Sequence, residues 1–280
     1  MQSRFAHPGL AAMLILLFLF PATGQARFER IVVAHDTNYP PFSYLDGGGN
    51  PTGLLIDLWR AFGKANKVEV EFRLATWGAS IDMVRNGHAH VHGGLVQSPE
   101  RSRTLIFGEK IESIPARLYL SAGIKGRYSP SRALRIGVIA QSYEEEYMRT
   151  TYPSQKLIPL LNNKALIESA AKGSLDGFVA DEPSVSHIMN VLKVTDLFQG
   201  NMLLYTLPLK YAVAKRNTEL LEFLNAGWSR VPEEERRRLR RKWYSFANEK
   251  KPIFDRNILL LGSALILLAL LLRRILRQRQ

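Results

Sequence analysis

Residues 31–46, IVVAHDTNYPPFSYLD, join a short apolar run to a loop rich in tyrosine, proline and aspartate. The run Ile31–Ala34 predicts a buried β-strand. Because ligands in α/β sheets bind beyond the carboxyl ends of strands, the loop is a candidate binding wall. Asp36 could accept hydrogen bonds from a ligand ammonium group, and Tyr39 could lie against the ligand. The alternative is structural, with Asp36 capping a turn and Tyr39 and Phe42 packing in the core; Phe42 is assigned to the core.

Strand and helix patterns alternate through most of the chain, which predicts an α/β fold with parallel strands. The rhythm restarts at Arg135, so we expect two lobes, with crossings between them near Arg117–Ala122 and Tyr205–Leu209. Strands are predicted at Ile31–Ala34, Val68–Leu74, Arg135–Ala140, Lys156–Leu161, Leu175–Ala180 and Leu207–Ala214. Helices are predicted at Leu54–Ala65, Trp77–Arg85, Ser142–Thr150, Lys164–Lys172, Ser184–Val191, Glu219–Trp228 and Pro232–Phe246.

The first 26 residues have the pattern of a signal peptide. Arg4 precedes the apolar run Leu10–Phe20, and the small residues Gly24 and Ala26 occupy the −3 and −1 positions of a cleavage site. The alternative is an uncleaved anchor, but the run is short for a span, which needs roughly 20 apolar residues. We therefore expect residues 1–26 to be removed on export.

The C-terminal region predicts a transmembrane helix over residues 258–276. Its first 15 residues, ILLLGSALILLALLL, carry no charge, and the arginines that follow predict a cytoplasmic tail over residues 277–280. A buried core helix is the alternative. The prediction is an exported domain, one membrane span and a short cytoplasmic tail, with residues 248–257 as a juxtamembrane linker.

The net charge of +13 is concentrated near this predicted span. Residues 27–229 carry 23 basic and 20 acidic side chains, whereas residues 230–256 carry 10 and 5. Attraction to anionic lipid or a solvated helix face explains such a distribution. We do not expect nucleic acid as a partner, because the folded body has no strong basic excess. The absence of cysteine excludes disulfides and thiolate zinc sites.

Five segments in order resemble the family 3 periplasmic solute-binding proteins. They are IVVAHDTNYPPFSYLD, GNPTGLLIDLWRAFGK, ATWGASIDMVRNGHAHVHGGLVQSPERSRTLIFG, RIGVIAQSYEEEYM and GSLDGFVADEPSV, and the resemblance covers roughly residues 29–246. It implies the two-lobed periplasmic-binding-protein fold, with a polar amino acid or a related solute held between the lobes. Residues 27–247 would form this domain, with lobe 1 about 27–117 and 210–247 and lobe 2 about 122–205.

The resemblance also implies the two residues that grip a zwitterion. Arg101, in the segment SPER, matches the arginine that holds the ligand α-carboxylate, a task that suits a planar guanidinium. Asp181 matches the aspartate that takes the α-ammonium group. Ser98 could add a hydroxyl or backbone donor, while Val96 replaces the hydroxyl residue found in many relatives. For Arg101 the alternative is a surface ion pair.

Three further residues are candidates for the binding site. Ser142 and Tyr143 match the second-lobe loop that adds hydrogen bonds to the ligand carboxylate in the family, although Tyr143 departs from the usual small hydroxyl residue. Trp77 matches an aromatic position and could line the pocket or pack at the start of its helix. We expect no catalytic residue and no cofactor, because no grouping typical of an enzyme accompanies these residues.

The triplet His88, His90 and His92 raises the question of a metal site. On a strand the three imidazoles would share one face, and histidines can bind zinc or copper. The alternative is a polar start to a strand, which we favour because no carboxylate pattern accompanies the triplet. No metal is therefore predicted.

Three classes of function remain. A membrane-tethered sensory module is favoured, because the segment AGWSRVPEEERRRLRRKW at residues 226–243 looks like the end of solute-binding domains that continue into the membrane in sensors. An anchored binding protein of an amino-acid ABC importer is the alternative, and an enzyme on the same fold is the least favoured. The expected partners are a small ligand, the membrane, and a signalling protein or an ABC permease.

Overall fold

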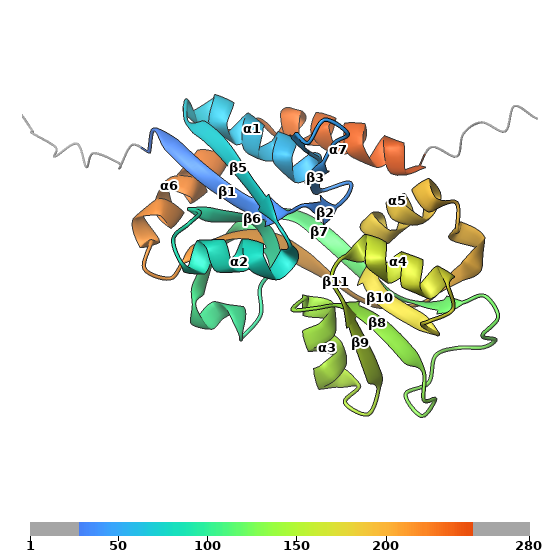
Figure 1. Cartoon of the computed structure of the whole chain (residues 1–280). Helices are drawn as coiled ribbons and strands as arrows, with labels where there is room; N and C mark the ends of the chain where they lie inside the picture. Colours follow the sequence, from blue (N-terminus) through green and yellow to red (C-terminus); the bar gives the residue numbers. More distant parts are fainter. Residues whose placement is uncertain (1–27, 249–280) are drawn as a thin grey trace, which may run out of the picture.

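The computed structural model describes residues 28–248, which form two lobes joined by a pair of long strands (Figure 1). One mixed sheet of eight strands runs through both lobes in the order β5-β1-β6-β11-β7-β10-β8-β9. The first lobe contains β1 (Arg30–Asp36), β5 (Glu69–Ala75), β6 (Val91–Val96), α1 (Leu54–Asn66) and α2 (Trp77–Arg85). The second contains β8 (Arg135–Ile139), β9 (Lys156–Leu160), β10 (Gly177–Asp181), α3 (Tyr143–Thr151), α4 (Asn163–Ala171) and α5 (Glu182–Leu192).

Smaller elements decorate the first lobe and the end of the second. A three-stranded sheet is formed by β2 (Asn38–Tyr39), β3 (Ser43–Leu45) and β4 (Pro51–Thr52), directly after β1. Two short 3₁₀ helices are η1 (Arg101–Arg103) and η2 (Thr195–Leu197). The predicted loop after the first strand is therefore partly a small sheet, which holds Tyr39 in place by pairing it with Ser43.

Two strands that end at the cleft position the candidate site. Strand β1 is buried from Ile31 to Asp36 and lies parallel to β5 and β6. Strand β10 lies parallel to β8 and ends at Asp181. Because side chains that follow the carboxyl ends of parallel strands face the opening of a sheet, Asp36 and Asp181 are brought to the space between the lobes.

The passage between the lobes is formed by β7 (Leu105–Ser121) and β11 (Phe198–Ala214). These strands pair antiparallel almost from end to end, from Ser121 with Phe198 to Leu105 with Ala214. The sequence suggests short crossings near residues 117–122 and 205–209, but residues 117–120 already pair with β10. The hydrogen-bond ladder continues through the hinge, so the chain changes lobes inside a strand rather than in a loop.

Each lobe has its own aromatic core. In the first, Trp59 packs edge-on against Trp228 at 5.1 Å between ring centroids, and Phe62 lies beside both. Gly227 permits this packing, because a Cβ atom there would lie 2.5 Å from the Phe62 ring. In the second lobe, Phe178 stacks on a tyrosine of β7 at 5.0 Å. Most of the buried residues of each lobe therefore pack within that lobe.

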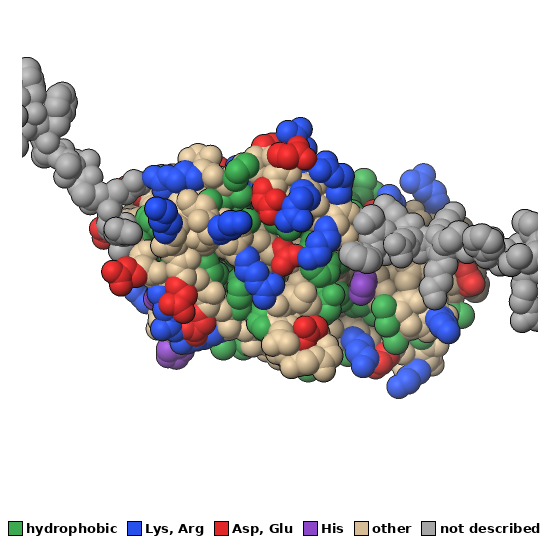
Figure 2. All heavy atoms as spheres, turned by 90° about the horizontal axis from the view of Figure 1, so that it is seen from above, with side chains coloured by type: hydrophobic (Ala, Val, Ile, Leu, Met, Phe, Trp, Pro, Cys, Tyr) green, Lys and Arg blue, Asp and Glu red, His purple; other side chains and the backbone are tan. Residues whose placement is uncertain are grey.

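The chain returns to the first lobe through α6 (Thr218–Trp228) and α7 (Glu233–Asn248). Helix α7 lies against α1 and buries Leu239 and Trp243, as its predicted apolar stripe requires. Acidic and basic side chains alternate on the face that these two helices form (Figure 2). The side chain of Phe246, also expected on the stripe, lies outside the described atoms.

Several predictions fall on residues that the structure does not describe. They are the signal peptide over residues 1–26, the linker beyond residue 248, the transmembrane helix over residues 258–276 and the cytoplasmic tail. Within residues 28–248, no helix combines the length and the apolar character that crossing a bilayer requires.

Candidate functional site

Asp36 lines an inner cavity between the lobes and is 4% exposed. Its Oδ1 accepts the backbone N–H of Asn38 at 2.8 Å. Asp36 therefore also caps a turn, which was the alternative role considered from the sequence. Burial raises the pKa of Asp36 to about 6, against the lowering effect of the neighbouring N–H groups. Most Asp36 side chains are thus ionised at neutral pH and can accept a further donor.

Tyr39 joins the two lobes directly. Its ring packs on Phe42 with 4.8 Å between centroids, and its hydroxyl donates to Oδ2 of Asp181 at 2.5 Å. Phe42 is fully buried in the first-lobe core, as predicted. Burial and the negative charge of Asp181 raise the pKa of Tyr39 well above its usual value, so the phenol stays a hydrogen-bond donor.

Asp181 stands where β10 ends and α5 begins. An aspartate in this position usually caps the helix, but here its side chain accepts no hydrogen bond from α5 and instead accepts one from Tyr39. Burial, together with the charge of Glu144, raises the pKa of Asp181 well above its usual value. The carboxyl is therefore aimed across the cleft, as the sequence predicts.

Arg101 is 4% exposed, so it does not form the surface ion pair that was considered as the alternative. Its Nη1 donates to the carbonyl of Val96 at 2.7 Å, and its Nη2 donates to the carbonyl of Gln141 in the second lobe at 3.3 Å. The guanidinium also lies 5.6 Å from the ring of Trp77. Burial lowers the pKa of Arg101, and nearby carboxylates oppose that shift. Among residues 28–248, no carboxylate forms an ion pair with it.

Trp77 fulfils both roles that the sequence allows, because it begins α2 and lines the inner cavity. Its Nε1 donates to the carbonyl of Gln141 at 3.1 Å. Gln141 adopts a left-handed backbone conformation with φ of 61°, and this turns its carbonyl toward the first lobe. Its side chain occupies the space beside Gly78, where a Cβ atom would lie 1.8 Å from Oε1. Sequence reasoning missed Gln141, since nothing in its residue type signals this position.

Ser98 supports Arg101 and does not line the inner cavity. Its hydroxyl accepts the backbone N–H of Arg101 at 3.3 Å, and it is buried. Val96 lines the cavity, where the sequence offers no side-chain hydroxyl. A direct contact between Ser98 and a ligand remains a prediction.

Ser142 and Tyr143 begin α3 and line the inner cavity from the second lobe. The Ser142 hydroxyl accepts the N–H of Glu145 at 3.1 Å and caps the helix. The Tyr143 ring packs against Tyr205 with 5.3 Å between centroids. The cavity is thus bounded by aromatic rings from both lobes.

Glu144 also lines the inner cavity and is a residue that sequence reasoning missed. It is the first member of a run of three glutamates, which in a sequence resembles the ordinary negative charge at a helix N-terminus. Successive helical residues point in directions about 100° apart. Glu145 therefore turns back to accept the N–H of Gln141, while Glu144 turns inward to Asp181.

The space between the lobes has two parts. The inner cavity is about 40 Å³ and lies among Asp36, Tyr39, Arg101 and Asp181. An outer groove of about 470 Å³ lies beside α2, η1 and α3, and Arg101 lines both. Because one water molecule needs roughly 10–15 Å³ of such space, the inner cavity has room for a few waters at most. A larger solute needs the lobes to part.

The histidine triplet does not lie on one strand. Strand β6 begins at Val91, so only His92 belongs to it, and His90 accepts the N–H of Val32 through Nδ1 at 3.1 Å. His92 is buried beneath Trp77. No group of three metal-ligand side chains occurs within the described part of the chain. The condition for a shared face of imidazoles, a strand through all three residues, is therefore not met.

Comparisons with known proteins place this geometry in context. A probable histidine-binding protein of Neisseria gonorrhoeae is 24% identical over 172 residues, which cover 60% of this chain and 63% of that protein. The sensor protein EvgS of Escherichia coli O157:H7 is 20% identical over 257 residues, covering 86% of this chain. The chain spans 21% of the length of EvgS.

Solved structures share the fold. A histidine kinase sensor domain with similarity to periplasmic binding proteins superposes with a TM-score of 0.73 at 22% identity, covering 78% of this chain and 96% of that one. The family model that describes bacterial extracellular solute-binding proteins, family 3, matches residues 31–246. This match spans both lobes, the hinge strands and most of α7, and the chain belongs to that family.

Proposed function

We propose that this domain binds an α-amino acid between its lobes, with the ligand carboxylate on Arg101 and the ammonium group on Asp181 or Asp36. The observation that carries the proposal is the state of Arg101. Its guanidinium is buried and donates to two carbonyl oxygens, and among residues 28–248 no carboxylate forms an ion pair with it. A buried cation is costly without a counter-charge, and a carboxylate supplies that charge with two parallel hydrogen bonds.

The opposite charge is available within the same cavity. Asp36 comes from the first lobe and Asp181 from the second, so a ligand ammonium group there would be held together with the carboxylate on Arg101. The name of the gonococcal relative, a probable histidine-binding protein, agrees with an amino-acid ligand. No catalytic step is proposed, because none of these groups is arranged as a nucleophile and base.

Binding requires a rearrangement of the cleft. An α-amino acid does not fit in about 40 Å³, so the lobes must separate, admit the ligand and close on it. The ligand ammonium group then replaces the Tyr39 hydroxyl as a donor to the Asp181 carboxylate. A ligand shifts such an equilibrium only through its different affinity for the two states, and Arg101 and Asp181 supply that difference.

The test is a thermal-shift comparison on the full-length chain purified in detergent. L-arginine, L-histidine and L-glutamine are the probes, and agmatine and histamine are matched compounds that lack the α-carboxylate. We expect at least one amino acid to raise the melting temperature, and its decarboxylated counterpart to raise it much less. Equal shifts from an amino acid and its amine would show that the carboxylate is not recognised and would overturn the proposal.

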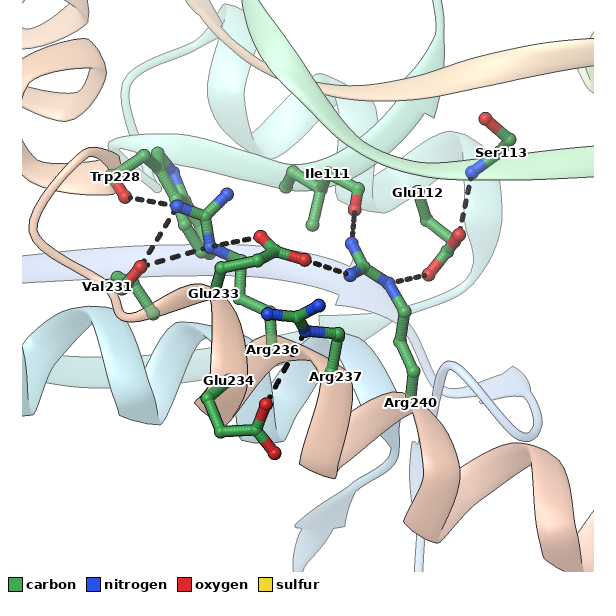
Figure 3. Close-up of polar contacts among 10 residues, drawn as sticks. All are labelled: Ile111, Glu112, Ser113, Trp228, Val231, Glu233, Glu234, Arg236, Arg237 and Arg240. Atoms are coloured by element: carbon green, nitrogen blue, oxygen red, sulfur yellow. Dashed lines mark hydrogen bonds and ion pairs between the residues drawn. The ribbon is translucent and has the colours of Figure 1, made fainter.

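We also propose that the domain is the input module of a membrane-tethered receptor, with an importer component as the alternative. The contacts of α7 support the sensory role (Figure 3). Arg240 donates to Glu112 at 2.9 Å and to the carbonyl of Ile111 at 3.0 Å, and both acceptors lie on the hinge strand β7. A movement of β7 on closure would therefore reach the helix that leads toward the predicted span at residues 258–276.

Membrane tethering has its own test. In this proposal the C-terminus is cytoplasmic and the binding domain periplasmic, so a green fluorescent protein fused after residue 280 should fluoresce in bacterial cells. The same cells should retain the fusion in the membrane fraction after an alkaline wash. Release of the fusion by that wash, or loss of fluorescence with a stable fusion, would argue against the single-pass topology.

A further inference from the structure

The inner cavity contains more negative than positive side chains. Its acidic lining residues are Asp36, Glu144 and Asp181, and its basic lining residue is Arg101. A zwitterionic α-amino acid adds one charge of each sign and leaves the excess of carboxylates unchanged. Since buried carboxylates are stable only when paired or protonated, the excess points to a further positive group in the ligand.

Glu144 is the carboxylate without an assigned role. It is 9% exposed, and no cation within residues 28–248 forms an ion pair with it. Its charge is one of the causes that raise the pKa of the nearby Asp181 carboxyl. Close by, the hydroxyl of Tyr205 is buried and has no hydrogen-bond partner among the described residues. Glu144 therefore lines the cavity without an ion pair among residues 28–248, and the buried hydroxyl of the nearby Tyr205 has no hydrogen-bond partner there.

We propose that the ligand is an α-amino acid with a cationic side chain, and that Glu144, assisted by the Tyr205 hydroxyl, binds that second cation. This inference rests on the proposed binding of an α-amino acid between the lobes. The aromatic rings of Tyr39, Trp77 and Tyr143 line the same cavity and favour a cation over a neutral group of equal size. The class is therefore that of arginine and lysine.

Binding should release a proton. Burial and the neighbouring charge of Glu144 raise the pKa of Asp181 well above its usual value and so favour its protonated form. When the ligand cations enter, both carboxylates become acceptors of cationic donors. The proton of Asp181 then passes to the solvent, and no bond between heavy atoms changes.

L-citrulline provides the test, because it replaces the guanidinium of L-arginine with a neutral urea group of nearly the same shape. Isothermal titration calorimetry on the full-length chain in detergent would measure both affinities. We expect L-arginine to bind about 10-fold or more tightly than L-citrulline, since a hydrogen bond to a charged group is stronger than one to a neutral group. Titration in two buffers of different ionisation enthalpy should show proton release with L-arginine.

Two variants test whether Glu144 itself causes the preference for L-arginine over L-citrulline. Glu144→Gln keeps the shape of the side chain and should remove most of the preference for L-arginine, together with the proton release. Glu146→Gln removes the same charge from the same helix but from the outer groove, so it should retain both. Equal losses in the two variants would show that long-range charge, not contact with Glu144, sets the preference.

The outcomes separate this inference from the proposed function. If L-citrulline binds the wild-type protein as tightly as L-arginine, the cationic class is wrong while binding of an α-amino acid stands. If L-arginine, L-lysine, L-citrulline and L-glutamine all fail to bind, the proposed function is wrong and this inference fails with it.

Discussion

Tyr39 and Asp181 belong to opposite lobes and are joined by a hydrogen bond of 2.5 Å, in which the phenol hydroxyl donates to the carboxylate. The contact uses the group that the proposed ligand requires, because Asp181 is a candidate acceptor for the α-ammonium. The contact between the lobes therefore uses the Asp181 carboxyl oxygen to which the ligand ammonium group would bind. Closure of the lobes and recognition of the ligand are linked through one carboxyl group.

Replacing Tyr39 with phenylalanine should favour the open arrangement of the lobes. The substitution removes the hydroxyl and leaves the ring packing on Phe42 intact. We expect a larger radius of gyration in small-angle X-ray scattering and a loss of about 1 kcal/mol in the free energy of unfolding. Tyr128→Phe is the matched control, because that hydroxyl bonds Gln155 within the second lobe at 2.9 Å. If both variants scatter like the wild-type protein, the contact does not hold the lobes together.

Arg101→Ala should weaken binding of an α-amino acid by roughly 30-fold or more, because removing one partner of a buried charge pair costs about 2–5 kcal/mol. The measurement is calorimetric titration with the amino acid that gives the largest thermal shift. Arg103→Ala is the control, since Arg103 lies two residues away on the exposed side of η1. Affinity that survives in Arg101→Ala would place the ligand carboxylate elsewhere.

His35 should make the fold sensitive to acid. The ring is 1% exposed, and burial lowers the pKa of His35 from 6.5 to about 3. Between these values the unfolded chain binds a proton that the folded chain does not, so the contribution of His35 to stability is lost as the pH falls. His35→Gln should therefore gain stability relative to the wild-type protein on acidification, by up to about 1.4 kcal/mol per pH unit.

Urea denaturation at pH 7.0 and 5.5 would measure this relative gain. The difference between variant and wild type matters, because Asp36 and Asp181 have raised pKa values and act in the opposite direction in both proteins. His88→Gln is the control, as His88 is exposed, and its stability should follow that of the wild-type protein at both pH values. A constant difference between His35→Gln and wild type would contradict the prediction.

Arg240→Met should loosen α7 from the hinge. It keeps much of the side-chain volume but leaves Glu112, whose side chain is 12% exposed, without its cation. We expect a loss of about 1–3 kcal/mol in the free energy of unfolding and faster hydrogen exchange across α7. Arg237→Met removes an exposed ion pair with Glu234 and should change little. Equal exchange in the two variants would mean that the contact with Glu112 does not secure the helix.

The sequence by itself determined the alternation of elements and the positions of the main charged residues. Helix α2 begins at Trp77 and ends at Arg85, the bounds predicted from the sequence, and Asp36 and Asp181 stand at the ends of strands that their apolar runs predict. Arg101 was found through a short motif. These features are local, because periodicity and strand ends depend on neighbouring residues in the chain.

Only the tertiary structure decided which side chains meet across the cleft. The carbonyl of Gln141 receives Trp77 and Arg101 because a left-handed backbone turns it toward the other lobe, and Glu144 faces the cavity because α3 is rotated by its packing on β8 and β9. Local sequence patterns also did not predict how the chain passes between the lobes, because β7 and β11 continue as strands through the hinge. Such contacts depend on how two rigid lobes are oriented, and no spacing within a single segment encodes that orientation.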